Sequence, residues 1–416
     1  MNNPGARALR VVMLTPDSQM IDRRIILEAR TLVEAGHRVD ILAGFECAEG
    51  KSYTEKNINI HRFKYDWDDE RLKRIRKHLP ENTSLRMFVN RLYMAMARGL
   101  MEVNPFEQYM ISKAISFDAD IYHVHDLPCL KAACLAARIK GVPLIYDSHE
   151  IYYAQESLPG RWKRKLLKTE KKYIKSADAV ITVNEFISKK IHDQHGINAE
   201  VIMNCADLPQ GLSRENAQAR LRGSLGLPED CKIVLYQGWI SGERNIETLV
   251  YGARYFPERT YLVIIGYGAY EETLREIMKK EGLEDRVFFL GPVDNDEILN
   301  YTAAADLAVI PYLPVDLNHL YCSPNKLFEY IVAGTPIVSH DLPFLSIIGN
   351  KYKVLRTVDM RSAEAFGRGV SHLISNKEAL NEMKENCLIA AKELNWAVEG
   401  QKLLSIYEKI FKPREN

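Results

Sequence analysis

Along the 416-residue chain, segments with two different spacings of apolar and polar residues follow one another. Short runs rich in Val, Ile, Leu and Tyr have the length of buried strands, and the longer stretches between them carry apolar residues at helical spacing. Runs such as LRVVML, PLIYDSHE, KIVLYQG and TYLVIIG predict strands. The predicted helices span 22–36, 107–117, 129–140, 161–176, 246–256, 270–282, 295–304 and 324–333. This alternation predicts an α/β fold built on parallel sheets with right-handed crossovers.

The length of the chain predicts two domains, because one core rarely organises so many residues. Strand–helix alternation lapses in a stretch where Pro and Gly cluster, and we place the hinge near residues 204–210. We therefore expect one Rossmann-like domain over 1–205 and a second over 206–395, with a cleft between them.

Three aspartates stand in similar contexts, each between a helix end and a strand: Asp120, Asp178 and Asp306. Open α/β sheets bind ligands beyond the carboxyl ends of their strands, whereas these residues precede the strands. We therefore expect a structural role for all three. A D-x-D pattern within 66–69 lies beside basic residues and is interpreted as a solvated loop rather than a metal–diphosphate site.

Composition supports a folded protein, with 46% hydrophobic and 27% charged residues. Residues 1–200 carry 32 basic and 26 acidic side chains, and the remainder carries 24 and 29, so the two halves predict different partners. Seven cysteines without a C-x-x-C pair argue against a disulfide framework or a zinc site. This cysteine usage favours a reducing, cytoplasmic setting. The first apolar run is too short for a signal peptide and no stretch approaches about 18 apolar residues, so we expect a protein that is soluble or lies on a surface.

The segment 321–338 predicts an anion site at a helix start. A good N-cap residue and a good first helical residue would leave three backbone N–H groups free at the positive end of the helix. These residues are, in order, Ser323, Pro324, Asn325, Lys326 and Leu327. Lys326 adds a cation, and Glu329 on the same face can accept both hydroxyls of a ribose. The pair suits a nucleoside diphosphate, although an exposed Lys–Glu pair explains this segment equally well when it is taken alone.

Other candidates for donor binding follow three further strands. Arg244 comes after a strand and a loop that begins at Gly238, and its guanidinium can bind two phosphate oxygens. Gly266 and Gly268 would let the backbone approach a ligand, but G-x-G-x-x-G is absent. Val293 ends VFFLGPV, where the backbone could contact a base or form an ordinary turn.

In the basic half, two His–acid pairs stand at the carboxyl ends of two predicted strands: His125 with Asp126, and His149 with Glu150. Such groups hold sugar hydroxyls and transfer protons. A single histidine is usually structural, and the repetition favours function. No third or fourth converging ligand is recognised, so no metal site is predicted.

Two basic runs, 71–77 and 161–175, accompany this half. The second has eight basic residues and one acidic residue with apolar positions among them, as in a helix that lies on an anionic membrane. A merely solvated helix is an equally good interpretation. No nucleic-acid motif accompanies the charge, so nucleic acid is not an expected partner.

Together, the segments HVHDLP, YDSHE, VIMNCADL, YQGWISGERNIETLV, SPNKLFEY and AGTPIV resemble the retaining glycosyltransferases of family 4. The resemblance implies the GT-B architecture of two Rossmann-like domains. It implies that Arg244 and Lys326 hold the diphosphate of a nucleotide-sugar and that Glu329 holds the ribose. It also implies that His125 contacts the sugar and that His149 and Glu150 line the acceptor side. The last segment, 396–416, would cross back onto the N-terminal domain.

Three departures from that pattern affect the expected site. Tyr321 stands eight residues before Glu329, where many members have the first Glu of E-x7-E. Trp239 follows Gly238 in the loop where many members pair Arg with Lys, and Arg244 occupies the usual Lys position. The Gly-Gly loop after the first strand is replaced by TPDSQMIDRR, from which Arg23 or Arg24 could approach a phosphate.

We therefore expect a hexosyltransferase-type glycosyltransferase that uses a nucleoside-diphosphate sugar, with UDP preferred over GDP and no metal required. The acceptor would be a glycan or a lipid-linked sugar in bacterial surface polysaccharide or glycolipid synthesis, reached at the inner face of the plasma membrane. The alternatives are a sugar-nucleotide epimerase of the same fold and an inactive membrane-surface adaptor.

Overall fold

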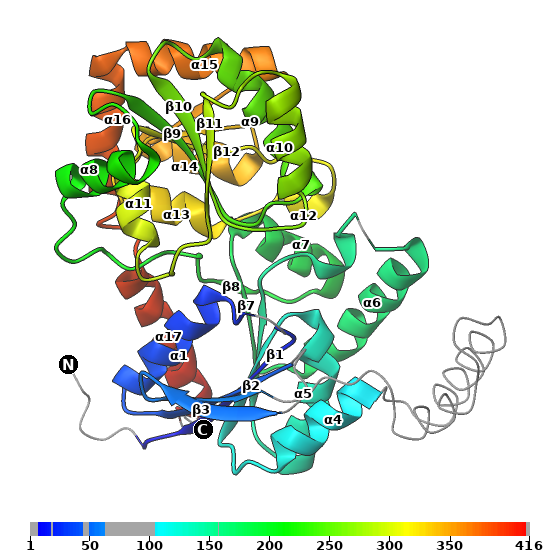
Figure 1. Ribbon diagram of the computed structural model, residues 1–416. Coiled ribbons are helices and arrows are strands. Elements are labelled where there is room, and N and C mark those ends of the chain that lie inside the picture. Colours follow the sequence, from blue (N-terminus) through cyan, green and yellow to red (C-terminus); the bar gives the residue numbers. More distant parts are fainter. Residues whose placement is uncertain (1–6, 18–19, 45–49, 63–104, 157, 413–416) are drawn as a thin grey trace. The chain divides into compact units, whose positions relative to one another are not determined.

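The computed structural model describes residues 7–17, 20–44, 50–62, 105–156 and 158–412 (Figure 1). The predicted basic run at 71–77 lies outside the described residues. The chain divides into two compact units. The first comprises Met1–Tyr153, Leu158–Ile202 and Lys402–Asn416, and the second comprises Ala154–Ser157 and Met203–Gln401.

The first unit is built on an eight-stranded sheet in the order β3-β4-β2-β1-β5-β6-β7-β8. Its strands are β1 (Arg10–Thr15), β2 (Arg38–Ala43), β3 (Lys51–Glu55), β4 (Ile58–Arg62), β5 (Ile121–His125), β6 (Leu144–Ser148), β7 (Ala179–Thr182) and β8 (Glu200–Val201). Its described α-helices, apart from the final helix, are α1 (Arg23–Glu34), α4 (Pro105–Ile115), α5 (Leu127–Lys140), α6 (Gly160–Tyr173) and α7 (Glu185–His195). All neighbouring strands are parallel except β3 and β4.

The β3–β4 hairpin departs from the expected all-parallel sheet. Its two turn residues, Lys56 and Asn57, have φ values of 48° and 65°, which suit a tight two-residue turn between antiparallel strands. The pattern analysis missed the hairpin because β3 is almost entirely exposed at the sheet edge and carries no apolar run.

The second unit is built on a six-stranded parallel sheet in the order β11-β10-β9-β12-β13-β14. Its strands are β9 (Lys232–Gln237), β10 (Thr260–Ile265), β11 (Val287–Gly291), β12 (Leu307–Ile310), β13 (Ile337–Ser339) and β14 (Leu355–Thr357). Its helices are α8 (Arg214–Leu225), α9 (Ile246–Gly252), α10 (Glu271–Lys280), α11 (Ile298–Ala304), α12 (Leu317–Leu320), α13 (Asn325–Val332), α14 (Pro343–Tyr352), α15 (Ala363–Ser375) and α16 (Lys377–Ala390).

Both faces of this second sheet are buried, which explains why its central strands are continuous apolar runs. On β9, Val234 and Tyr236 face a core shared with α9, α10 and α15, whereas Ile233 and Leu235 face a core shared with α8 and α11. Successive side chains of a strand point to opposite faces, so a single run of six residues supplies both cores.

The three aspartates that precede strands are structural, as predicted. The backbone N–H groups of Arg10, Leu144 and Ile233, at neighbouring strand starts, donate to the carboxylates of Asp120, Asp178 and Asp306 respectively. Each aspartate N–H also donates to a backbone carbonyl at the same neighbouring strand start. Each residue therefore joins two parallel strands at their amino ends.

Strand order fixes where ligands can bind in each unit. In both sheets the order reverses beside the first strand, between β1 and β5 and between β9 and β12. Open α/β sheets bind ligands beyond the carboxyl ends of the strands at such a reversal. The candidate residues at the ends of β5, β6 and β9 therefore lie at the favoured edge of their own sheets.

The last helix, α17 (Trp396–Phe411), contributes to both units. At its start, the Trp396 N–H donates to the carbonyl of Ala206, and Glu399 accepts the N–H of Met203 at 2.8 Å. Further along, the hydroxyl of Tyr407 lies 3.0 Å from Nδ1 of His123 in the first unit. Among the described residues, the helices are all too short or too polar to cross a membrane.

Candidate active site

Lys326 is the central residue of the candidate site in the second unit. It lies in the first turn of α13, is only 7% exposed, and its Nζ lies 4.1 Å from the ring centre of Tyr236 and 5.1 Å from that of Tyr312. Nζ is buried, and within the described parts of the chain it has no hydrogen-bond partner. Burial and the nearby Arg244 guanidinium lower the pKa of Lys326 well below its ordinary value, despite the opposing effect of Glu329.

Arg244 lies beside Lys326 at the end of a short 3-10 turn, Gly242–Arg244. Its Cζ lies 4.6 Å from the ring centre of Tyr312, so the two cations share one aromatic neighbour. The next residue, Asn245, has a left-handed φ of 55°, and its Nδ2 donates to the carbonyls of Pro311 and Met360. These bonds fix the loop that presents Arg244.

Glu329 lies one turn after Lys326, and its carboxylate is oriented by a polar relay. Nε2 of Gln237 donates to Oε2 of Glu329, and Oε1 of Gln237 accepts a hydrogen bond of 2.7 Å from the hydroxyl of Thr302. Gln237 is the last residue of β9, where a polar side chain ends an apolar strand. The sequence analysis missed Gln237 and Thr302, although that position at a strand end was a usable signal.

The helix start differs from the prediction in one respect. Helix α13 begins at Asn325, and Pro324 is its N-cap residue, with the extended backbone values φ −71° and ψ 136°. The prediction of Ser323 as the cap and Pro324 as the first helical residue is therefore wrong. The N–H of Leu327 is not free either, because it donates to the carbonyl of Pro324 at 3.0 Å.

The corrected start still offers polar groups to an anion. Asn325 and Lys326 are now the first two helical residues, whose N–H groups point out of the helix. The Ser323 hydroxyl is buried and, as far as the structure is described, lacks a hydrogen-bond partner. The Ser323 carbonyl accepts a 2.7 Å hydrogen bond from Nδ2 of Asn204, which ties this loop to the segment after β8.

The glycines after β9 and β10 are required by contact between loops. A Cβ on Gly266 would lie 1.9 Å from the carbonyl oxygen of Gly238, and one on Gly268 would lie 2.0 Å from that of Ile240. Gly238 is itself exposed, with φ 129°, and a Cβ there would lie 3.0 Å from Nζ of Lys326. The close approach expected of Gly266 and Gly268 is therefore first an approach to neighbouring backbone.

Aromatic and backbone contacts complete this edge of the sheet. Trp239 and Tyr267, both exposed, form an edge-on pair with ring centres 5.0 Å apart. The Tyr236 hydroxyl donates to the Trp239 carbonyl at 2.7 Å. Val293 follows β11 and packs, partly buried, against the α8–α11 core. Tyr321, one of the departures from the family pattern, is partly exposed in the loop before α13.

In the first unit, Arg24 is the buried centre of a charged cluster. It is 2% exposed and donates through Nε and Nη2 to both oxygens of Asp147, at 2.9 and 3.1 Å. Nη1 donates to the Ile202 carbonyl, and Nε lies 3.0 Å from Glu28. Arg24 and His149 hold the pKa of Asp147 well below its ordinary value although burial acts to raise it. The alternative of Arg24 as a phosphate-binding residue is therefore disfavoured by its inward position.

His125 and His149 meet at the carboxyl ends of β5 and β6. Nδ1 of His125 lies 3.2 Å from Nε2 of His149, which also lies 3.2 Å from Oδ2 of Asp147. Burial lowers the pKa of His125 to about 4. Burial also acts to lower the pKa of His149, but Asp126 and Asp147 outweigh it and raise the value to about 10. The paired histidines therefore differ in charge near neutral pH.

Asp126 completes this group. Its φ of 60° is unusual for a residue other than glycine, and such strain often marks functional sites. Its Oδ1 accepts the His149 N–H at 3.2 Å, and burial raises its pKa to about 7. Glu150 and Arg23 are partly exposed, the latter as the first residue of α1. Of the predicted residues in this unit, the structure brings Asp126, His125 and His149 together.

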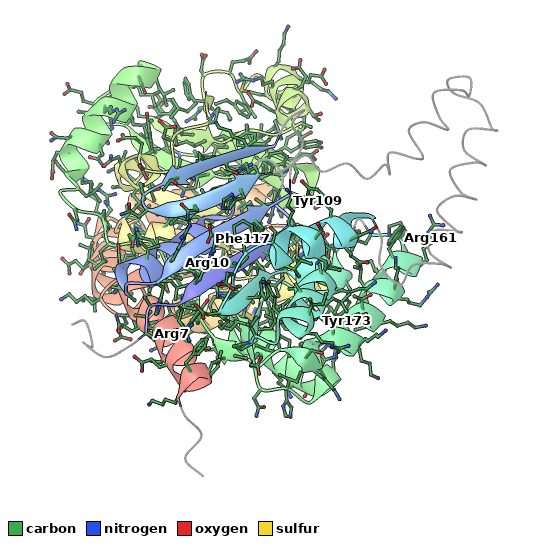
Figure 2. The ribbon with its side chains drawn as sticks, turned by 90° about the horizontal axis from the view of Figure 1, so that it is seen from below. Arg7, Arg10, Tyr109, Phe117, Arg161 and Tyr173 are labelled. Carbon is green, nitrogen blue, oxygen red and sulfur yellow. The ribbon has the colours of Figure 1, made fainter. Side chains whose placement is uncertain are left out.

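Helix α6 presents a basic surface, and Figure 2 labels Arg161 and Tyr173, the second and the last residue of this helix. Glu170 and Tyr173 are buried, whereas the exposed basic residues of the helix are Arg161, Arg164, Lys165, Lys168, Lys171 and Lys172. Nζ of Lys165 lies 5.0 Å from the ring centre of Trp162, which is also exposed. The helix therefore combines positive charge with an accessible aromatic residue.

Comparison with known proteins defines the class of the protein. A family model described as Glycosyltransferase Family 4 matches residues 21–210, and a model described as Glycosyl transferases group 1 matches residues 217–388. Among solved structures, HepE from Anabaena in complex with UDP and glucose superimposes with a TM-score of 0.71 at 16% identity, over 96% of this chain and 100% of that one. This chain is a glycosyltransferase of GT-B fold.

Named relatives agree with this class. D-inositol 3-phosphate glycosyltransferase of Corynebacterium efficiens is 22% identical over 314 residues, which are 70% of this chain and 71% of that protein. The putative teichuronic acid biosynthesis glycosyltransferase TuaC of Bacillus subtilis is 21% identical over 253 residues, 61% of this chain and 60% of that protein. Sucrose-phosphate synthase from Thermosynechococcus elongatus superimposes with a TM-score of 0.69 at 16% identity, over 97% of this chain and 99% of that one.

Proposed function

We propose that the second unit binds a UDP-sugar at the carboxyl ends of β9 and β12, with its diphosphate against Arg244, Lys326 and the start of α13. The observation that carries this proposal is the buried Nζ of Lys326, which lacks a hydrogen-bond partner among the described residues. A buried cation without a partner destabilises the protein unless a ligand uses it. Diphosphate oxygens would supply the missing partner of Lys326 and lie beside the Arg244 guanidinium, and HepE, a structural neighbour, is known in complex with UDP.

Glu329 completes the donor site by accepting the hydroxyls of the ribose. A carboxylate beside two cations would repel a phosphate, so it suits the sugar part of the nucleotide. The relay from Thr302 through Gln237 fixes the orientation of its carboxylate, so the group is held in place before the nucleotide binds. Val293 and the loops that begin at Gly238 and Gly266 form the remaining wall, and their backbone groups are the candidates for contact with the base.

We propose transfer with retention of the anomeric configuration, following the resemblance to family 4. An acceptor hydroxyl oxygen forms a bond to the anomeric carbon while the bond from that carbon to the diphosphate oxygen breaks. The hydroxyl proton passes to an oxygen of the departing diphosphate, and UDP leaves as the second product. Arg244 and Lys326 stabilise the negative charge that develops on the leaving group, which is electrostatic catalysis without a required metal.

The acceptor side of the proposal lies at the ends of β5 and β6. His149 and Asp126 are the accessible members of the cluster there, and their paired charges suit sugar hydroxyls. His125 is fully buried beneath them, so we assign it to positioning His149. Glu150, which follows His149 in sequence, and Arg23, which precedes the buried Arg24, are partly exposed and are proposed as further acceptor contacts. The acceptor class is a glycan or a lipid-linked sugar, as the teichuronic acid relatives suggest.

We also propose that α6 places the enzyme on an anionic membrane surface. Six exposed basic residues and exposed Trp162 on one helix match the features of interfacial helices. This would suit a lipid-linked acceptor.

Titration calorimetry with UDP tests the donor site. Lys326→Ala and Glu329→Gln are expected to weaken UDP binding by more than about tenfold, the effect of losing one charged hydrogen bond. Lys384→Ala is the matched control: this lysine of the same unit lies 3.8 Å from Asp306, at the amino end of β12, and its loss should leave binding unchanged. Wild-type affinity in both site variants would contradict the proposal.

A second assay separates the enzymatic alternatives. The protein is incubated with UDP- and GDP-sugars, with and without membrane extract, and nucleotide release is measured. Transfer predicts release that depends on the acceptor. An epimerase would release nucleotide or form an epimer without one, and an inactive adaptor would release none with any donor.

A further inference from the structure

A second cluster of unsatisfied polar groups lies inside the first unit, under the acceptor side. His123 and His125 are two residues apart on β5, so their side chains share one face of the sheet, and their rings stack with centres 4.5 Å apart. Glu28 of α1 and Asp147 of β6 approach the same point. One potential ligand atom from each of the four residues lies within 4.8 Å of the other three, and all four residues are buried.

The hydrogen bonds of the two histidines follow the pattern of metal ligands. Nδ1 of His123 is engaged by the Tyr407 hydroxyl at 3.0 Å, and Nδ1 of His125 by Nε2 of His149 at 3.2 Å. The opposite ring nitrogen, Nε2, is buried in both residues without a hydrogen-bond partner in the described structure. A metal-bound histidine typically engages its other nitrogen in this way, which fixes the ring and its tautomer.

Glu28 is also buried without hydrogen bonds from the described residues. Its Oε1 lies 3.0 Å from Nε of Arg24 as an ion pair, but neither of its oxygens has a hydrogen bond within the described residues. Its Oε2 is 3.6 Å from Nε2 of His123, beyond the usual hydrogen-bond range. A buried polar atom without a hydrogen bond destabilises the folded protein, so several such atoms at one point indicate a shared partner.

We propose that Glu28, His123, His125 and Asp147 bind one divalent transition-metal ion of the zinc class. Two imidazole nitrogens with carboxylate oxygens suit zinc and its first-row neighbours, whereas magnesium prefers oxygen ligands and retains its waters. The ligands come from three elements, α1, β5 and β6, so the ion would join the helix to the sheet. Because the group is buried, its role is structural and separate from the reacting sugar.

The geometry requires only a local contraction. Bonds of about 2.0–2.1 Å in a tetrahedron put ligand atoms roughly 3.3 Å apart, so atoms now within 4.8 Å must approach by up to about 1.5 Å. Asp147 can keep one oxygen on Arg24, which then acts as an outer partner of the ion. Ligation through Nε2 requires that Nδ1 of His125 donate to His149, so binding displaces a proton from that pair.

Metal analysis of the purified full chain tests the proposal. The protein is stripped with a chelator, dialysed, and titrated with Zn²⁺, Co²⁺ or Mg²⁺. We expect about one Zn²⁺ per chain, a Co²⁺ form with the visible absorption of nitrogen and oxygen ligation, no competition from Mg²⁺, and a melting temperature that rises with Zn²⁺.

Two ligand variants and one control assign the site. Glu28→Gln removes a carboxylate, and His123→Asn removes Nε2 while its amide can still bond Tyr407. Each should weaken Zn²⁺ binding by more than about 100-fold, beyond the usual effect of an outer partner. Glu170→Gln changes another buried carboxylate, which contacts His195 at 3.2 Å, and should keep the ion.

The wild-type titration keeps the proposal testable even where a variant fails to fold. Absence of stoichiometric Zn²⁺ and of a Zn²⁺-dependent melting shift in the wild-type protein would overturn the proposal and leave a protonated Glu28 as the explanation of the cluster. Unchanged Zn²⁺ affinity in folded Glu28→Gln and His123→Asn proteins would overturn it as well. The outcome is independent of UDP binding, because none of these residues belongs to the second unit.

Discussion

At the scale of single residues, Lys326 is a buried charge that lowers the stability of the fold. A lysine in a pocket formed by Tyr236 and Tyr312 loses its hydration, and Arg244 nearby adds like-charge repulsion. Aromatic faces compensate in part, since they attract a cation. The remaining cost is consistent with a site organised for an anionic ligand, because function is commonly obtained at the expense of stability.

Lys326→Met should therefore stabilise the protein without ligand, by about 1–3 kcal/mol at neutral pH, the usual cost of one buried unsatisfied group. The pKa of Lys326 is lower in the folded protein than in the unfolded chain, so the unfolded chain binds more protons between the two values. Wild-type stability should consequently rise with pH through that window, and the rise should be smaller in the variant. Urea unfolding across pH measures both effects. A destabilised variant with the wild-type pH slope would contradict this account.

At the scale of elements, α6 has a buried side that packs on the first unit and an exposed side that carries its basic residues. Glu170 and Tyr173 are buried, and Glu170 accepts from the Tyr146 hydroxyl at 3.1 Å, which anchors the helix to β6. The basic residues on the exposed face contribute little to the stability of the fold. They can therefore be changed with little effect on folding.

Charge reversal of Arg164, Lys168 and Lys171 to Glu should weaken binding to vesicles that contain anionic phospholipid by about 100-fold or more. Each basic residue near such a surface contributes about 1 kcal/mol. Vesicle sedimentation measures the partition. The control reverses Lys279 and Lys280, exposed at the end of α10 in the second unit, and should bind like the wild type. If the α6 variant bound the vesicles as strongly as the control variant, α6 would be excluded as the membrane contact.

At the scale of the whole molecule, the final helix belongs to two units at once. Residues of α17 up to Gln401 are part of the second unit, and those from Lys402 are part of the first. Tyr407, 2% exposed, joins the core of the first unit through its ring and its bond to His123. The second half of α17 therefore folds into the same unit as β5, although some 280 residues separate His123 from Tyr407.

Tyr407→Ala should destabilise the first unit by about 3–5 kcal/mol, as expected when a buried aromatic side chain is removed. UDP binding, which we assign to the second unit, should keep its affinity. Hydrogen exchange resolved by peptide measures the first effect, and calorimetry the second. Loss of protection in both units to the same extent would show that they unfold as one.

Much of the fold followed from pattern alone. The apolar run of β9 predicts a strand buried on both faces, and the aspartates before strands were recognised as structural because ligands bind at the other edge. The β3–β4 hairpin is not predicted by the pattern because its edge strand is exposed and has no apolar run. The predicted start of α13 is wrong by one residue. Ser323 suits the N-cap position and Pro324 the first helical position, but in the structure Pro324 is the N-cap residue and Asn325 is the first residue of the helix.

The parallel-sheet architecture, the polar residues at the strand ends and the spacing of Lys326 and Glu329 on one helix could all be predicted from the amino-acid sequence, because periodicity and helix spacing are local properties. Which groups meet could be seen only in the folded chain: Gln237 with Glu329, Gly266 with the backbone of Gly238, and Glu28 with His123 and His125. These contacts join residues distant in sequence, and whether a polar atom is satisfied depends on the neighbours that folding brings to it.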